Sequence, residues 1–169
     1  MIGSGVFVRR LIMVAGIALV VFAADQVSKY WILSIYDLPA RGSVPILPVF
    51  NLTMVWNTGI TFGLFRADGW LGRLALDGIA LAIVALLLNW LRQNPPRLVV
   101  VAIGLIAGGA AGNLHDRIVF GAVADFLHFH VYGYSWYVFN VADASIVCGG
   151  LAIALDALFP SGAKVTKTP

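Results

Sequence analysis

The stretch FNVADASIVCGGLAIALDALF, residues 139–159, decides the fold class of this chain. A run of about 20 mostly apolar residues is what a helix needs to cross a hydrocarbon core of ~30 Å. Asp143 stands near the start of the run, and the next charged residue is Asp156. A charge within a membrane span costs about 2.5–3.5 kcal/mol on insertion scales and often marks a functional site. The segment therefore predicts a membrane helix that carries a functional carboxylate.

The composition of the whole chain indicates the same class of protein. Hydrophobic residues make up 60% of the 169 residues and charged residues 11%, against about 25% charged residues in ordinary soluble domains. The mean hydropathy is +0.91 and the pI is about 9.3. Because the basic residues flank apolar runs, the positive charge indicates membrane topology rather than a nucleic-acid partner. We expect a single integral membrane domain over residues 1–169.

Four apolar segments predict a mainly α-helical membrane protein with four transmembrane helices. Each segment is close to the length that spans a bilayer as a helix. The two connecting segments between spans one and two and between spans three and four are expected to lie outside the cytoplasm. The predicted spans are about 11–33, 70–90, 98–117 and 140–159, and the predicted outer segments are about 37–69 and 118–139.

Basic residues predict that both termini face the cytoplasm. Lys and Arg concentrate in cytoplasmic loops of membrane proteins, and that orientation places six of them on one side: Arg9, Arg10, Arg92, Arg97, Lys164 and Lys167. The first span also resembles a cleavable signal peptide, with a basic start and a short apolar core. Apolar character resumes after DQVSK (25–29), so we expect the span to be retained, which mass spectrometry of the mature N-terminus would test.

The outer segments have patterns of their own. In VFNLTMVW (49–56) apolar and polar residues alternate with a period of two, which predicts a small β-sheet at the membrane surface. FLHFHVYGYSWYVF (126–139) has seven aromatic residues and is typical of an interfacial belt or lid. Gly104, Gly108 and Gly112 form a stripe that favours close helix packing, or alternatively close approach of a substrate backbone.

Polar residues gather at one predicted depth. Counted at about 1.5 Å per helical residue, a set of polar residues late in the first and third spans, early in the fourth span and in the segment before it lies near the outer face. Helical spacing allows an ion pair between Asp25 and Lys29 and between Arg73 and Asp77, and for Arg73 with Asp77 we expect the ion pair. The residues that share the outer layer are Asp25, Lys29, Asn113, Asp116, Arg117, Asp125, Asn140 and Asp143.

Asp125 and Asp143 differ from the other acids because no lysine or arginine adjoins either in the sequence. Two carboxylates in a low-dielectric pocket cannot both ionise readily, so one keeps its proton while the other stays charged. Such a pair supplies a general base that activates water and a general acid that protonates a leaving group. The alternative is two separate aspartates that each cap a helix end. Residue patterns alone leave both open.

Other functions remain in view from the residues alone. Aspartates within membrane spans also serve proton relays, so an ion-handling protein is one alternative and a structural membrane subunit is another. His128 and His130 are a weak candidate metal site, because the sequence offers no evident third ligand near them. No HExxH and no GxSxG motif is present, which argues against a zinc peptidase and a serine hydrolase of those types.

Five motifs in order resemble one known family. They are DQVSK (25–29), NTGITFGLF (57–65), GGAAGNLHDR (108–117), VADF (123–126) and FNVADA (139–144). The set resembles the bacterial lipoprotein signal peptidases, the signal peptidase II family of aspartic peptidases. The resemblance extends from Asp25 to the fourth span. It implies an intramembrane endopeptidase that cuts diacylglyceryl-modified prolipoproteins before the lipidated cysteine.

The resemblance also implies roles for individual residues. The catalytic pair of the family maps onto Asp125 and Asp143. The residues that hold substrate or support the site map onto Asp25, Lys29, Asn57, Gly59, Gly108, Asn113, Arg117 and Asn140. The departures from the family pattern are Ile60, Thr61 and His115, which bear on substrate and inhibitor preference rather than on the reaction.

Further expectations concern partners and location. The resemblance implies no cofactor or metal, sensitivity to the peptide antibiotic globomycin, and a bacterial cytoplasmic (inner) membrane location with the active site near the outer face. We expect a monomer whose partners are lipidated prolipoproteins and membrane lipids, with no nucleic acid.

Overall fold

The computed structural model describes residues 4–59 and 70–159 of the chain. Within these residues, four helices are long enough and apolar enough to cross a membrane. This bears out the predicted fold class, while the orientation of the termini stays a prediction. The long helices are α1 (Ser4–Tyr30), α3 (Trp70–Trp90), α4 (Arg97–Phe120) and α5 (Val141–Leu158).

Short helical turns join the long helices to their neighbours. After α1 the chain continues in a turn of π-helix, Trp31–Ile35, and then in the one-turn helix α2 (Leu38–Arg41). A 3₁₀ turn, Leu91–Gln93, ends α3. Pro95 and Pro96 then keep the chain extended until α4 begins at Arg97, as expected because proline lacks the N–H that an α-helix needs.

Helix α4 lies at the centre of the bundle and packs against α1, α3 and α5. Its glycines make the close approach possible. A Cβ on Gly108 would lie 2.6 Å from the carbonyl oxygen of Ala18 in α1, and one on Gly104 would lie 2.7 Å from Cβ of Ile17. The contacts of these two glycines are therefore helix-packing contacts, as the first of the two interpretations of the stripe predicts.

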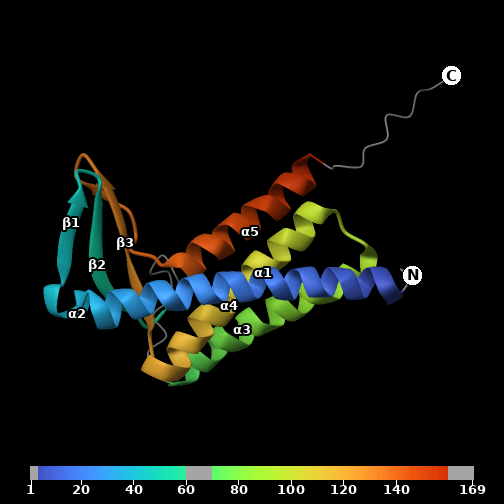
Figure 1. The fold of residues 1–169 in the computed structure, drawn as a ribbon, viewed down its shortest axis with the longest axis horizontal. Helices are drawn as coiled ribbons and strands as arrows, with labels where there is room; N and C mark the ends of the chain where they lie inside the picture. The colour runs from blue at the N-terminus through green and yellow to red at the C-terminus, as the bar shows by residue number, and fades with distance from the viewer. Residues whose placement is uncertain (1–3, 60–69, 160–169) are drawn as a thin grey trace.

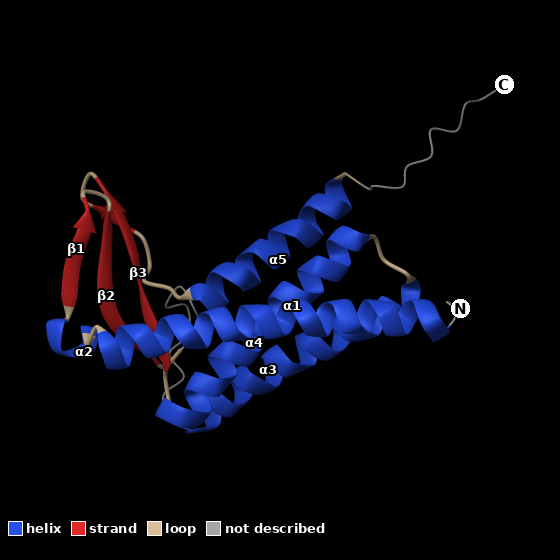
Figure 2. Ribbon diagram, in the orientation of Figure 1, coloured by secondary structure: helices blue, strands red, loops and turns tan. Residues whose placement is uncertain are grey.

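A small antiparallel sheet stands at one end of the bundle (Figures 1 and 2). Its strands follow the order β1-β2-β3-β4. The predicted small sheet is present, and residues 50–56 of the alternating segment lie in its strand β2. The first residues of the aromatic segment 126–139, which was predicted as a belt or lid, belong to a long strand, β3, that pairs with β2. The strands are β1 (Ser43–Leu47), β2 (Phe50–Asn57), β3 (Val123–Val131) and β4 (Tyr134–Ser135).

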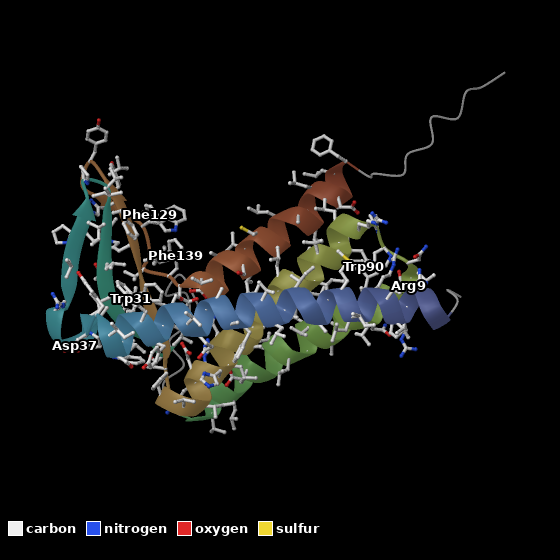
Figure 3. All side chains as sticks on the ribbon, in the orientation of Figure 1. Arg9, Trp31, Asp37, Trp90, Phe129 and Phe139 are labelled. Atoms are coloured by element: carbon white, nitrogen blue, oxygen red, sulfur yellow. The ribbon has the colours of Figure 1, made fainter. Side chains whose placement is uncertain are left out.

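The two ends of the bundle differ in character. Helix α1 begins and α5 ends at the end away from the sheet (Figure 1). Arg9 and Trp90 lie at that end, whereas Phe129 of β3 and Phe139 lie at the end with the sheet (Figure 3). The two phenylalanine rings stack with their centroids 6.0 Å apart. The sheet, the start of α5 and the end of α4 thus meet at one end of the molecule, where the sequence places its polar residues.

Candidate active site

The start of α5 is built by a reciprocal cap. Asn140 is the N-cap residue, and its Oδ1 accepts a hydrogen bond from the backbone N–H of Asp143 at 2.9 Å. The backbone N–H of Asn140 donates in return to Oδ2 of Asp143 at 3.4 Å. Asparagine and aspartate at these positions satisfy N–H groups that a helix start leaves without partners. The cap holds Asp143 in the first turn of the helix with its carboxylate turned back toward the sheet end.

Asp125 reaches the same place from the sheet. It lies in the buried first half of β3 and is paired with Val55 of β2 in the ladder. Asn57 lies two residues beyond Val55, so it shares a face of the sheet with Asp125. The amide Nδ2 of Asn57 donates to Oδ2 of Asp125 at 3.0 Å. Strand pairing thus delivers one hydrogen-bond donor to this carboxylate.

Asn140 joins the two aspartates. Its Nδ2 donates to Oδ1 of Asp125 at 2.7 Å, while its Oδ1 holds the N–H of Asp143. Asn113 of α4 completes the link, since its Nδ2 donates to Oδ1 of Asp143 at 2.8 Å and its Oδ1 accepts from Asn140 at 3.1 Å. All four side chains are buried. The structure therefore brings together Asp125 and Asp143 around a pair of asparagines.

The electrostatics of Asp125 suit acid–base chemistry. Burial, together with the charge of Asp143, raises the pKa of Asp125 from 3.8 to about 7. Hydrogen bonds from Asn57 and Asn140 and the positive charge of Lys29 act in the opposite direction. A carboxyl with a pKa near neutrality exists in both protonation states at pH 7. It can therefore take up or release a proton under physiological conditions.

Two cavities flank Asp143. One of about 340 Å³ lies between α3, α4 and α5, and Asn113, Arg117 and Asp143 supply its polar lining beside apolar residues such as Ile79 and Ile146. The other, of about 260 Å³, is lined by Asp143 and Val147 together with the aromatic residues Trp136, Tyr137 and Phe139. The carboxylate of Asp143 thus borders two mainly apolar spaces.

Arg117 borders the first cavity and has a partner that the sequence does not reveal. Its guanidinium forms an ion pair with Asp77 of α3 at 3.1 Å. The predicted pairing of Arg73 with Asp77 is therefore wrong, because Arg73 donates instead to the carbonyl oxygen of Gly121 at 2.8 Å. Helical spacing brings Arg73 and Asp77 to one face of α3, but contacts with α4 decide which partner each side chain takes.

Gly59 lies next to Arg117 and Asn57. Its N–H donates to Oδ1 of Asn57 at 2.9 Å, and its carbonyl oxygen accepts from Arg117 at 3.5 Å. Gly59 is buried and is the last described residue before the gap at 60–69. Ile60 and Thr61 lie outside the described residues. His115, another departure from the family pattern, packs edge-to-face against Phe22 with ring centroids 5.8 Å apart.

Asp25 and Lys29 form the ion pair that their spacing allows, with Nζ of Lys29 2.7 Å from Oδ2 of Asp25. The sequence does not reveal the other partner of Lys29, because its Nζ lies equally close to Oδ2 of Asp116 in α4. Gln26 joins the same cluster and donates to both acids. Asp116 is already among the residues of the predicted outer layer, whereas Gln26 is not, and its position within DQVSK (25–29) is the sequence signal that could have identified it.

His128 has a structural environment in the sheet. Its Nδ1 lies 3.1 Å from Oγ1 of Thr53, and its Nε2 lies 2.7 Å from Oγ of Ser135. Both partners come from neighbouring strands. These contacts give His128 a role in holding strands together and do not connect it to Asp125 or Asp143.

Comparison with known proteins gives a consistent result. The family model described as "Signal peptidase (SPase) II" matches residues 17–159. A protein of Nitrobacter hamburgensis named "Lipoprotein signal peptidase" is 45% identical over 143 residues, which cover 82% of this chain and 87% of that protein. One of the same name from Methylobacterium sp. (strain 4-46) is 44% identical over 151 residues, covering 89% and 92%.

Solved structures agree with the sequence comparisons. A structure described as "Bacterial membrane enzyme structure by the in meso method at 2.3 A resolution" superposes with a TM-score of 0.77 at 28% identity and covers 93% of this chain and 94% of its own. A second, described in the same words at 1.9 Å, has a TM-score of 0.71 at 30% identity and covers 88% and 94%. The chain is therefore similar to these proteins over nearly its whole length.

Proposed function

The chain belongs to the signal peptidase II family, and from this premise we propose how it removes signal peptides from prolipoproteins and which residues do so. In this proposal Asp125 and Asp143 are the catalytic pair. The observation that carries the proposal is the pair of hydrogen bonds made by the side chain of Asn140. Its Nδ2 donates to the carboxylate of Asp125, and its Oδ1 accepts from the backbone N–H of Asp143 in the first turn of α5. Two buried aspartates on different elements share one fixed bridge.

The pair divides the work of hydrolysis. One carboxylate takes a proton from water, and the water oxygen attacks the carbonyl carbon that precedes the lipidated cysteine. The tetrahedral intermediate collapses when the carbon–nitrogen bond breaks and the protonated carboxyl gives its proton to the leaving amine. The pair titrates as a unit, so the roles of base and acid belong to the pair. The raised pKa of Asp125 supports this division, because it keeps a proton available near neutral pH.

The neighbouring polar side chains orient the reacting groups. Asn57, Asn113 and Asn140 hold the carboxylates in place by hydrogen bonds. Arg117 and Gly59 border the region that substrate occupies in this proposal. Fixed donors in a site with little water stabilise developing charge without having to reorganise during the reaction.

The cavities suit the two parts of a lipidated substrate. The space between α3, α4 and α5 has an apolar wall that fits the apolar segment of a signal peptide. The aromatic-lined space on the other side of Asp143 fits an acyl chain of the diacylglyceryl group. Asp143 borders both spaces, as cleavage at the boundary between signal peptide and lipidated cysteine requires.

The proposal places the enzyme in the bacterial inner membrane with its active site near the outer face and both termini in the cytoplasm. Arg9 and Trp90 lie at the bundle end away from the sheet (Figure 3), Arg92 lies in the 3₁₀ turn after α3, and Arg97 begins α4. Basic residues favour the cytoplasmic side. The sheet and the aspartates then face the periplasm, where lipidated precursors present their cleavage site.

Cleavage of a diacylglyceryl-modified prolipoprotein by purified protein in detergent tests this proposal. We expect Asp125→Asn and Asp143→Asn each to lower kcat by about 10²–10⁴-fold, the range that general acid–base groups supply. Asp156→Asn is the matched control, because Asp156 belongs to the same helix α5 near its other end. It is expected to cleave like the parent.

The possible outcomes test the catalytic residues, the peptidase activity and the substrate class separately. Undiminished cleavage by either folded Asn variant would rule out the two-aspartate mechanism. Absence of cleavage by the folded parent with several lipidated substrates would overturn the proposed activity itself. Cleavage of an unlipidated precursor at the same rate would contradict the assignment of the substrate class.

A further inference from the structure

A buried cation lies between two acids from different helices. Lys29 of α1 places its Nζ 2.7 Å from Oδ2 of Asp25 and 2.7 Å from Oδ2 of Asp116 in α4. All three side chains are almost completely buried. Gln26 donates from Nε2 to Asp25 at 3.1 Å and to Asp116 at 3.2 Å. Asp25, Lys29 and Asp116 are not among the residues that line the two cavities beside Asp143.

Each acid of this cluster holds the backbone immediately before one member of the pair. Oδ1 of Asp25 accepts from the N–H of Ala142, the residue before Asp143, at 2.9 Å. Oδ2 of Asp116 accepts from the N–H of Ala124, the residue before Asp125, at 3.1 Å. In both contacts a carboxylate accepts a hydrogen bond from a backbone N–H, at the start of α5 in one case and in strand β3 in the other.

We propose that Asp25, Lys29 and Asp116 form a positioning triad that sets the spacing and direction of Asp125 and Asp143. Lys29 ties the two acids together, and each acid fixes one backbone segment. The triad thus connects α5 to β3 through α1 and α4. This inference rests on the proposed function, because it assigns the triad a role in that reaction.

The energetics favour a geometric role over a general stabilising one. Taking charges out of water is expensive, and a buried ion pair is often no more stable than apolar residues of the same volume. The first turn of α5, by contrast, needs partners for its free N–H groups, and a carboxylate is favoured there by the helix dipole. Asp25 supplies a partner for the N–H of Ala142 and Asn140 one for the N–H of Asp143.

Gly112 of α4 provides space for the triad. A Cβ at this position would lie 2.5 Å from Oδ2 of Asp25 and 3.4 Å from Cβ of Ala142. The absence of a side chain at Gly112 is therefore what allows Asp25 to pass α4 and reach the start of α5. The last glycine of the predicted stripe serves the triad, whereas Gly104 and Gly108 pack against α1.

Lys29 also acts on Asp125 through its charge. The positive charge of Lys29 lowers the pKa of Asp125, against the stronger effects of burial and of Asp143. Asp125 further faces Asn57 from β2 and Asn140 from the start of α5. Removal of the Lys29 charge is therefore expected to let Asp125 keep its proton to higher pH.

Steady-state kinetics of the full chain in detergent, with a diacylglyceryl-modified prolipoprotein, test the inference. We expect Lys29→Met to lower kcat by about 10–100-fold, since small misplacements of catalytic groups have effects of this size. KM should stay unchanged because the triad does not line the cavities, and the pH–rate profile should move to higher pH. Arg10→Met is the control, since Arg10 lies at the other end of α1 and donates to the carbonyl oxygen of Pro95.

Two substitutions of Asp116 separate the hydrogen bond that holds the backbone before Asp125 from the negative charge of Asp116. Asp116→Ala removes the acceptor for the N–H of Ala124, whereas Asp116→Asn keeps an acceptor oxygen of the same shape. We expect Asp116→Asn to retain more kcat than Asp116→Ala. Lys29→Met combined with Asp116→Ala should lower kcat little further than the more affected single variant, because residues that act as a unit are not additive.

Several results would overturn the triad while leaving the peptidase intact. These are a folded Lys29→Met variant with the kcat and pH profile of the parent, a rise in KM alone, and equal kcat for the two Asp116 variants. Unfolding of all three single variants, measured by thermal denaturation, would show a purely structural role and would also overturn it. Failure of the parent to cleave would instead overturn the proposed function.

Discussion

At the scale of single residues, Asn140 has two separable duties. Its Oδ1 caps α5 by accepting from the N–H of Asp143, and its Nδ2 donates to Asp125 and Asn113. Helix capping is a role that many asparagines have. The hydrogen bonds from Nδ2 to Asp125 and Asn113 depend on the packing of β3 and α4 beside the start of α5. One amide thus joins helix formation to the arrangement of the aspartate pair.

Substitutions of Asn140 can separate the capping of α5 from the hydrogen bond to Asp125. Serine is also a good N-cap, whereas alanine is not, so Asn140→Ala should be less stable than Asn140→Ser by about 1 kcal/mol. Both should lose about 10–100-fold in kcat, because both remove the donor to Asp125 and disturb the placement of its carboxylate. Thermal unfolding and cleavage rates of the two purified variants measure the two effects.

The pH dependence of these variants follows from the same hydrogen bond. A donor to a carboxylate stabilises its charged form, and the bond from Asn140 lowers the pKa of Asp125. Its loss raises that pKa further, so the pH–rate profile of Asn140→Ser should move to higher pH than that of the parent. A profile at the parent's position, with kcat retained, would show that Asn140 serves only as a cap.

At the scale of secondary-structure elements, α5 presents adjacent glycines with opposite surroundings. A Cβ on Gly149 would lie 2.7 Å from Cγ1 of Ile106 and 2.8 Å from the carbonyl oxygen of Ala102, both in α4. A Cβ on Gly150 would have no heavy atom within 4 Å. The two residues are neighbours in the sequence, yet only one faces α4. Close packing of α5 on α4 is what holds Asp143 beside Asn113.

These two glycines make a matched test of the packing. Gly149→Ala should destabilise the protein by about 1–3 kcal/mol, the usual cost of adding a group to a filled contact. Gly150→Ala should be neutral or stabilise by up to about 1 kcal/mol, because alanine favours helix over glycine. Thermal unfolding of both variants in the same detergent measures the difference. Equal stability of the two would contradict the orientation of α5 in which Gly149, and not Gly150, faces α4.

At the scale of the whole molecule, the four helices and the sheet divide the protein into two ends. The sheet and the aspartate pair occupy one end, together with the exposed aromatic residues Tyr132 and Trp136, which adjoin β3 and β4. The start of α1, the turn between α3 and α4, and the end of α5 occupy the other (Figure 1). Since signal peptides of prolipoproteins are cut at the outer face in our proposal, the orientation of these ends is part of the mechanism.

Cysteine labelling in right-side-out membrane vesicles tests this orientation. After Cys148→Ser removes the only native thiol, Tyr132→Cys and Gln93→Cys place single thiols at exposed positions on opposite ends. A membrane-impermeant maleimide should label Tyr132→Cys in intact vesicles and Gln93→Cys only after permeabilisation, because the sheet end faces outward. The reverse pattern would invert the proposed topology, and cleavage by each variant confirms that it is folded.

The sequence by itself determined the membrane helices and the depth at which polar groups gather. Insertion depends on the local sum of apolar surface over about 20 residues, which any window of the sequence contains. The alternation in β2 and the pairing of Asp25 with Lys29 were likewise predictable, because strand and helix periodicities are local. The five ordered motifs added the family and with it the expected aspartate pair.

Only the tertiary structure decided which side chains meet across elements. The contacts of Lys29 with Asp116, of Arg117 with Asp77 and of Asn140 with Asp125 join distant parts of the chain. The orientation of each helix about its own axis selects these partners. The same holds for β3, whose aromatic sequence is equally suited to an interface and becomes a strand because β2 offers its edge. Local periodicity determines which face of an element is polar, whereas packing against the other elements determines what that face touches.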